Sequence, residues 1–335
     1  MNKKEHKSKK FSFFKREEKK KGSFLKESLW PILIISLFAT LFFGSNILAQ
    51  NLFDFSSMPR ILAATILVAA PMLITGIVGL WIPALLKKSK NVKVSKLAKN
   101  FLAYADFAVL VFWVGFIMTI SQIIFSLIFT LILDPSQLQM PLANALYQAA
   151  VYAAAMVVII KLSARIKKEA KTTREELGLT GLPTWTDIGL APVSFIAYII
   201  VGGAIMAVAE ALLSRFSWFD ANQAQDVGFK LLNSPFDRII AFIALVVVAP
   251  ICEEIVFRGW LYGKLRRKMS MGAAILVVSV FFGIMHGQWN VGINVFALSI
   301  LLCLEREVTG TIYASILTHM IKNGIAYALL YIFMY

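Results

Sequence analysis

The stretch IIAFIALVVVAPICEEIVFRGW, residues 239–260, decides the fold class of this chain. Its apolar run is about as long as the roughly 20 helical residues that cross the hydrocarbon of a bilayer. The same stretch contains Glu253, Glu254 and Arg258, whose charges are costly inside a membrane and usually serve a function there. We therefore predict a transmembrane helix over 238–263 that carries functional side chains.

The rest of the chain is also too apolar for an ordinary soluble domain. It has 335 residues, of which 59% are hydrophobic. We predict an all-α fold, a polytopic transmembrane helical bundle of about eight or nine helices. Besides the helix over 238–263, the expected spans are 29–49, 61–86, 107–133, 143–163, 187–212, 272–287, 291–304 and 309–334.

The net charge is +15, and the positive residues are distributed along the chain as in a membrane protein. Lysine and arginine gather in alternate connections, while the connections between them are neutral or balanced, which is the positive-inside pattern. This pattern predicts a multi-pass protein of the cell membrane with a cytoplasmic N-terminus, and it makes the lipid bilayer a partner. Nucleic-acid binding is not needed to explain the charge, so we predict no nucleic-acid partner. The basic segments are 1–28, 87–100, 164–176 and 264–268.

The sequence divides into four parts. A basic cytoplasmic tail precedes a block of four transmembrane helices, and the first of these helices is expected to be retained and not cleaved as a signal. A cytoplasmic linker follows, in which the glycines and proline of LGLTGLPTW break any helix. The last part contains all the candidate catalytic residues. The four parts are 1–28, 29–163, 164–185 and 186–335.

Helical spacing separates the two adjacent glutamates. Glu254 and Arg258 are four residues apart, so they can pair on one helix face, whereas Glu253 is turned about 100° away. Glu253 is therefore the candidate general base, and the other two residues support it. Pro250 removes a backbone donor and leaves a carbonyl without its helical partner one turn earlier, as in a kinked functional helix.

Two histidines in predicted helices complete the candidate site. His286 lies in FFGIMHG, and His319 lies in THMIKNG four residues before Asn323, so those two side chains share a face. Intramembrane histidines are functional candidates, although hydrogen bonds between helices are an alternative reading of each. We expect Glu305, Arg306 and Glu307 to lie in a cytoplasmic turn.

Three motifs in this order resemble a known family. EEIVFRG (253–259), FGIMH (282–286) and HMIKN (319–323) are similar to the EExxxR, FxxxH and HxxxN motifs of the CPBP intramembrane proteases. That family includes the CAAX prenyl endopeptidases and bacterial relatives linked to bacteriocin processing and self-immunity. The resemblance covers roughly 186–335, and the four N-terminal helices lie outside it.

The resemblance implies a helical intramembrane endopeptidase that acts on a membrane-associated peptide or protein. It implies that Glu253, assisted by His286, activates water, while His319 and Asn323 stabilise the oxyanion. No cofactor is required in this interpretation. Two histidines and a glutamate can also hold catalytic Zn²⁺, so a zinc site of Glu253, His286 and His319 is the alternative, although the HExxH signature is absent.

Two other classes of function remain open from the sequence. A non-catalytic membrane scaffold or a bacteriocin self-immunity protein would keep the same fold. A secondary transporter would also place charged residues at the membrane midplane, but the two halves of the chain show no repeat. The basic tail and compact size suggest a bacterial protein.

Overall fold

All the regular secondary structure in the described part of the chain is helical. The computed structural model describes residues 24, 27–37, 39–40, 124, 141–146, 148–153, 156, 174–217, 219–223, 229 and 232–333, and these contain no strand. The all-α prediction is confirmed for this part. The predicted span 61–86 lies outside the described residues, and so does the span 107–133 apart from residue 124. The count of eight or nine helices therefore stays a prediction.

Two described helices are long and apolar enough to cross a membrane. One is α8, Trp185–Leu213, and the other is a continuous helix over Pro235–Arg266. Helix α8 begins at a capping box, in which the Asp187 carboxylate accepts the Thr184 N–H at 2.7 Å and Thr184 Oγ1 accepts the Asp187 N–H at 3.3 Å. Many of its large apolar side chains are exposed, as expected of a helix that faces lipid.

The helix over Pro235–Arg266 changes its winding four times. It consists of α9 (Pro235–Phe242), the π-helix η3 (Ile243–Val248), α10 (Ala249–Glu254), the π-helix η4 (Ile255–Tyr262) and α11 (Gly263–Arg266). At the end of η3 the Ala249 N–H donates to the carbonyl of Ala244, five residues earlier. Pro250, which has no N–H, follows at the second position of α10. Such π-helical turns occur frequently at functional sites.

Three helices follow, and one of them corrects the sequence prediction. They are α12 (Met271–Ile284), α13 (Trp289–Thr309) and α14 (Tyr313–Ala328), the last continued by the π-helix η5 (Leu329–Phe333). The predicted turn at Glu305, Arg306 and Glu307 is wrong, because α13 runs through all three residues to Thr309 and is capped by Gly310, whose φ is 70°. Glu305 and Arg306 are buried. Arg306 donates to the Gly310 carbonyl, and Thr318 donates to the Glu305 carboxylate.

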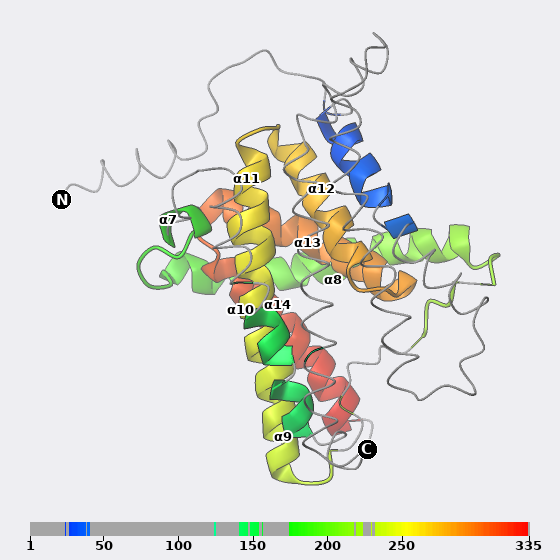
Figure 1. Ribbon diagram of the computed structural model, residues 1–335. Helices are drawn as coiled ribbons and strands as arrows, with labels where there is room; N and C mark the ends of the chain where they lie inside the picture. Colours follow the sequence, from blue (N-terminus) through cyan, green and yellow to red (C-terminus); the bar gives the residue numbers. More distant parts are fainter. Residues whose placement is uncertain are drawn as a thin grey trace. The chain divides into compact units, whose positions relative to one another are not determined.

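The candidate residues all belong to one compact unit, made of residues 1–28, 172–227 and 242–335. A second unit comprises residues 29–171 and 228–241. Within the first unit α13 packs against α8, α12 and α14, and α10 packs against α14 (Figure 1). The helix with the two glutamates therefore lies beside the helix with His319 and Asn323.

A pair of glycines brings α12 and α13 together. A Cβ atom on Gly283 would lie 2.7 Å from the carbonyl oxygen of Gly292, and one on Gly292 would lie 2.9 Å from that of Gly283. Both contacts are with backbone atoms, so neither position has room for a side chain. The backbones of the two helices therefore meet three residues before His286.

Candidate active site

The buried centre of the site is an ion pair within one helix. Arg258 Nη1 donates to Glu254 Oε1 at 2.7 Å, and both side chains are fully buried. Glu254 ends α10 and Arg258 lies in η4, so the four-residue spacing brings the two groups together as the sequence indicated. Charges inside a membrane are rarely found without such a partner.

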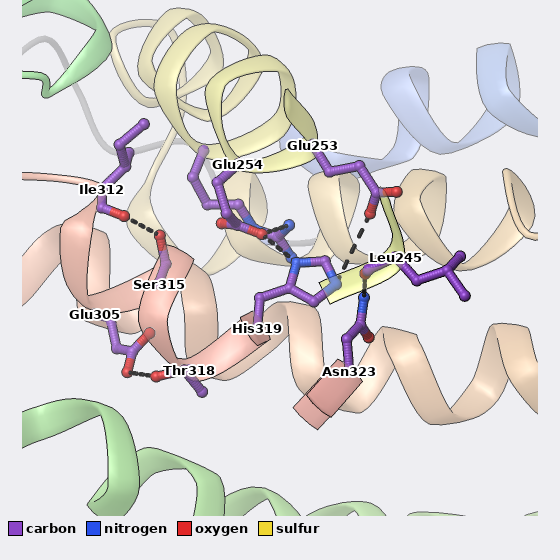
Figure 2. Close-up of polar contacts among 10 residues, drawn as sticks. Leu245, Glu253, Glu254, Glu305, Ile312, Ser315, Thr318, His319 and Asn323 are labelled. Atoms are coloured by element: carbon purple, nitrogen blue, oxygen red, sulfur yellow. Dashed lines mark hydrogen bonds and ion pairs between the residues drawn. The ribbon is translucent and has the colours of Figure 1, made fainter. Parts of the chain in front are cut away.

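His319 connects this ion pair to the second glutamate. Its Nδ1 lies 2.9 Å from Glu254 Oε1, and its Nε2 lies 3.8 Å from Glu253 Oε2 (Figure 2). An ionised carboxylate only accepts hydrogen bonds, so Nδ1 carries a hydrogen and Nε2 is the ring atom that faces Glu253. The Glu253 side chain keeps 19% of its surface exposed, whereas Glu254 keeps none. The two adjacent carboxylates thus lie in different surroundings.

His286 lies just beyond the end of α12, where its ring orientation is fixed. Its Nδ1 lies 2.8 Å from the carbonyl oxygen of Phe282. A carbonyl accepts, so Nδ1 carries the hydrogen and Nε2 is the basic nitrogen. The ring of Phe282 makes edge contacts with both imidazoles, at centroid distances of 4.9 Å to His286 and 6.0 Å to His319.

Phe282 also contacts the buried cation. The Arg258 guanidinium carbon lies 4.4 Å from the centre of its ring, a cation–π contact. Sequence reasoning used Phe282 only as the first letter of a motif and missed this role. The signal was present, because an aromatic residue four positions before His286 shares a helix face with it.

Asn323 makes a hydrogen bond to backbone. Its Nδ2 donates to the carbonyl oxygen of Leu245 in η3 at 2.9 Å (Figure 2). That acceptor fixes which end of the amide is the nitrogen, since a carbonyl cannot bond to Oδ1. Asn323 is therefore joined to the helix that carries both glutamates, and it lies one helical turn beyond His319.

A second buried carboxylate lies behind the site. Thr318 Oγ1 donates to Glu305 Oε1 at 2.5 Å, and Glu305 is only 3% exposed. Thr318 immediately precedes His319, so this bond ties the base of the His319 turn to α13 (Figure 2). Sequence reasoning missed the contact because three charged residues in a row looked like a solvated turn.

The alternative interpretation of the site is a zinc ion bound by Glu253, His286 and His319. Among the residues that the structure describes, no group of three or more His, Cys, Asp or Glu side chains is arranged to hold a metal ion. Glu253 and His319 face each other, but with His286 they do not form such a group. The zinc alternative stays a prediction, and metal analysis of the purified protein tests it.

The segment that contains these site residues matches a known protein family. Residues 235–325 match the type II CAAX prenyl endopeptidase Rce1-like family. The Rce1-like segment includes every candidate residue, from Glu253 to Asn323, and the match confirms the resemblance to CPBP proteases. It supports a CAAX-type intramembrane protease in general. No curated protein and no solved structure gives a significant match.

Proposed function

We propose that this protein is an intramembrane endopeptidase that hydrolyses a peptide bond of a membrane-associated protein or peptide. The observation that carries the proposal is the pair of Glu253 and His319, held 3.8 Å apart by the buried ion pair behind them. Peptide hydrolysis needs a base for water and donors for the developing oxyanion, and this cluster offers both. The Rce1-like match supports the same class of enzyme.

The reaction begins with water between Glu253 and His286. Glu253 takes one proton from the water, and His286 Nε2 orients the water by accepting a hydrogen bond from it. The oxygen attacks the peptide carbonyl carbon, so a C–O bond forms and the carbonyl π electrons move to oxygen. Glu253 then gives its proton to the leaving nitrogen as the C–N bond breaks, which yields a carboxyl and an amine product.

The oxyanion is stabilised from α14. His319 presents its Nε2 edge to the oxyanion, while its Nδ1 contacts Glu254 and this second contact fixes the plane of the ring. Asn323 offers the amide hydrogen that Leu245 does not use. No metal ion takes part in the proposed reaction, because protein donors alone hold the negative charge.

The test is Glu253→Gln in proteoliposomes. The amide keeps the shape of the side chain but takes no proton from water, so we expect cleavage of membrane-associated peptides to be abolished while folding and insertion are kept. Glu210→Gln, at an exposed position of α8, is the matched control and should cleave normally. Normal proteolysis by Glu253→Gln would remove Glu253 as the base. Membrane peptidomes that do not differ between cells with wild-type protein and with Glu253→Gln would favour a non-catalytic scaffold.

A further inference from the structure

We propose that Pro250 is a positioning residue of the proposed peptidase, and that it acts through Asn323. By lacking an N–H, Pro250 leaves the Leu245 carbonyl to the Asn323 side chain, and this bond fixes the orientation of the Asn323 amide in the site. The inference rests on the proposed function, and it assigns a role to a residue that touches neither water nor substrate.

The hydrogen bonds of η3 show why the Leu245 carbonyl is available. In an α-helix this carbonyl would accept the N–H of residue 249, and in a π-helix that of residue 250. The Ala249 N–H instead donates to Ala244, and Pro250 has none to donate. The Leu245 carbonyl therefore receives a hydrogen bond from neither of the two backbone N–H groups that could bind it within a helix.

Asn323 replaces those donors from another helix. Its Nδ2 lies 2.9 Å from the Leu245 oxygen, across 78 residues of sequence. A backbone carbonyl without a partner costs several kcal/mol in a bilayer, where water does not compete for it. The bond therefore gives the Leu245 carbonyl of η3 a hydrogen-bond donor, and at the same time it holds one end of the Asn323 amide.

The orientation of this amide matters for the oxyanion. An asparagine presents two N–H bonds from one nitrogen and an acceptor from the other end. With one N–H bound to Leu245, the nitrogen cannot rotate away, and its second N–H has a fixed direction. Helix α10 is also joined to α14 by the contact of Glu254 with His319, which involves neither Pro250 nor Leu245, so a change at Pro250 acts first on the bond of Asn323.

The first experiment measures thermal stability and needs no activity. Asn323→Ala leaves the Leu245 carbonyl without a donor, so we expect the unfolding midpoint to fall by several degrees. Pro250→Ala supplies an N–H, and the helix can then satisfy Leu245 in either the α or the π form. The double variant should therefore recover at least half of the midpoint lost in Asn323→Ala. A double variant that is less stable than Asn323→Ala would overturn the proposal.

The second experiment measures kinetics. Pro250→Ala gives the Leu245 carbonyl a competing donor, so we expect kcat to fall about tenfold while KM changes less than twofold. In the Asn323→Ala background the same change should lower kcat less than twofold, since the residue through which Pro250 acts is gone. Pro192→Ala is the matched control, because Pro192 also lies inside a helix but is exposed on α8, and it should leave kcat unchanged.

The outcomes separate this inference from the proposed function. Equal losses of kcat in the wild-type and Asn323→Ala backgrounds would overturn the action of Pro250 through Asn323 while leaving the peptidase intact. A wild-type protein that cleaves no membrane peptide would overturn the proposed function and with it the role of Pro250 in catalysis. Recovery of stability in the double variant would still support the exchange of donors at Leu245.

Discussion

Glu253 and Glu254 are adjacent in sequence, but the fold gives them different partners. Glu254 is fully buried between Arg258 and His319, with two hydrogen bonds to one of its oxygens. Glu253 is partly exposed and faces the other nitrogen of His319. One carboxylate therefore orients the imidazole, and the other is placed where water can reach it.

The buried ion pair should be important for stability. Glu254→Gln or Arg258→Ala leaves a buried charge without its partner, a change that typically costs about 3–5 kcal/mol. We expect a strongly reduced yield of folded protein, measured by size-exclusion chromatography in detergent. Arg267→Ala is the control, since Arg267 pairs with Glu176 with 47% of its side chain exposed and should lose less than about 1 kcal/mol. A normal yield for both core variants would contradict this account.

Asn323→Ala should mainly affect the chemical step. Loss of one oxyanion donor typically costs on the order of 2.7 to 4 kcal/mol of transition-state stabilisation. We expect a large decrease in kcat with KM little changed, measured on the folded fraction because the bond to Leu245 is lost as well. An increase in KM with kcat preserved would instead assign Asn323 to substrate binding.

Metal analysis tests the same mechanism. Because protein donors hold the oxyanion in the proposed reaction, we expect purified protein to lack stoichiometric zinc and to keep its activity in a strong chelator. The zinc alternative makes the opposite prediction. Stoichiometric zinc that disappears in both His286→Ala and His319→Ala would reject the metal-free reaction while leaving the protease proposal intact.

Contacts between residues close in sequence could be predicted, whereas contacts between different helices could not. The pair of Glu254 with Arg258 follows from a four-residue spacing, whereas the contact of Glu254 with His319 needs two helices to pack in one register. Pro250 indicated a carbonyl without its helical donor, but no pattern of side chains could identify Asn323 as the group that binds it. Glu305 is buried and accepts a hydrogen bond from Thr318 of another helix, so the charged triplet alone was misleading.

At the scale of the helices, close contact of two backbones positions His286. The α12–α13 crossing is held at Gly283 and Gly292, and His286 follows three residues later. The sequence predicted both helices from their apolar runs. It did not predict the crossing, because a glycine in an apolar helix does not indicate which neighbour it contacts.

Gly283→Ala should therefore separate the two helices. The new Cβ would lie 2.7 Å from a backbone oxygen that cannot move aside alone, and overpacking of this kind costs about 1–3 kcal/mol. We expect a lower unfolding midpoint and a loss of activity, because His286 moves with the end of α12. Gly203→Ala is the matched control, since nothing lies within 4 Å of its added Cβ, and it should be neutral or stabilising. Equal effects of the two changes would contradict the role of the crossing.

At the scale of the whole molecule, the charge pattern predicts the orientation in the membrane. The N-terminus and the connections 87–100 and 264–270 should be cytoplasmic. Lys93→Cys and Lys268→Cys test this on intact cells with a membrane-impermeant thiol reagent, which should label neither until the membrane is made permeable. Labelling of position 93 from outside would invert the topology.

The order in which the ion pair and His319 appear along the chain has a consequence for biosynthesis. Arg258 follows Glu254 by only four residues, so the pair can form as soon as that helix leaves the ribosome. His319 comes 65 residues after Glu254, which at typical rates of translation corresponds to roughly 3 to 13 s. During that interval the insertion machinery receives a helix in which Arg258 already neutralises Glu254, one of its two glutamates. The local pair thus lets the acidic helix enter the bilayer before the rest of the site has been made.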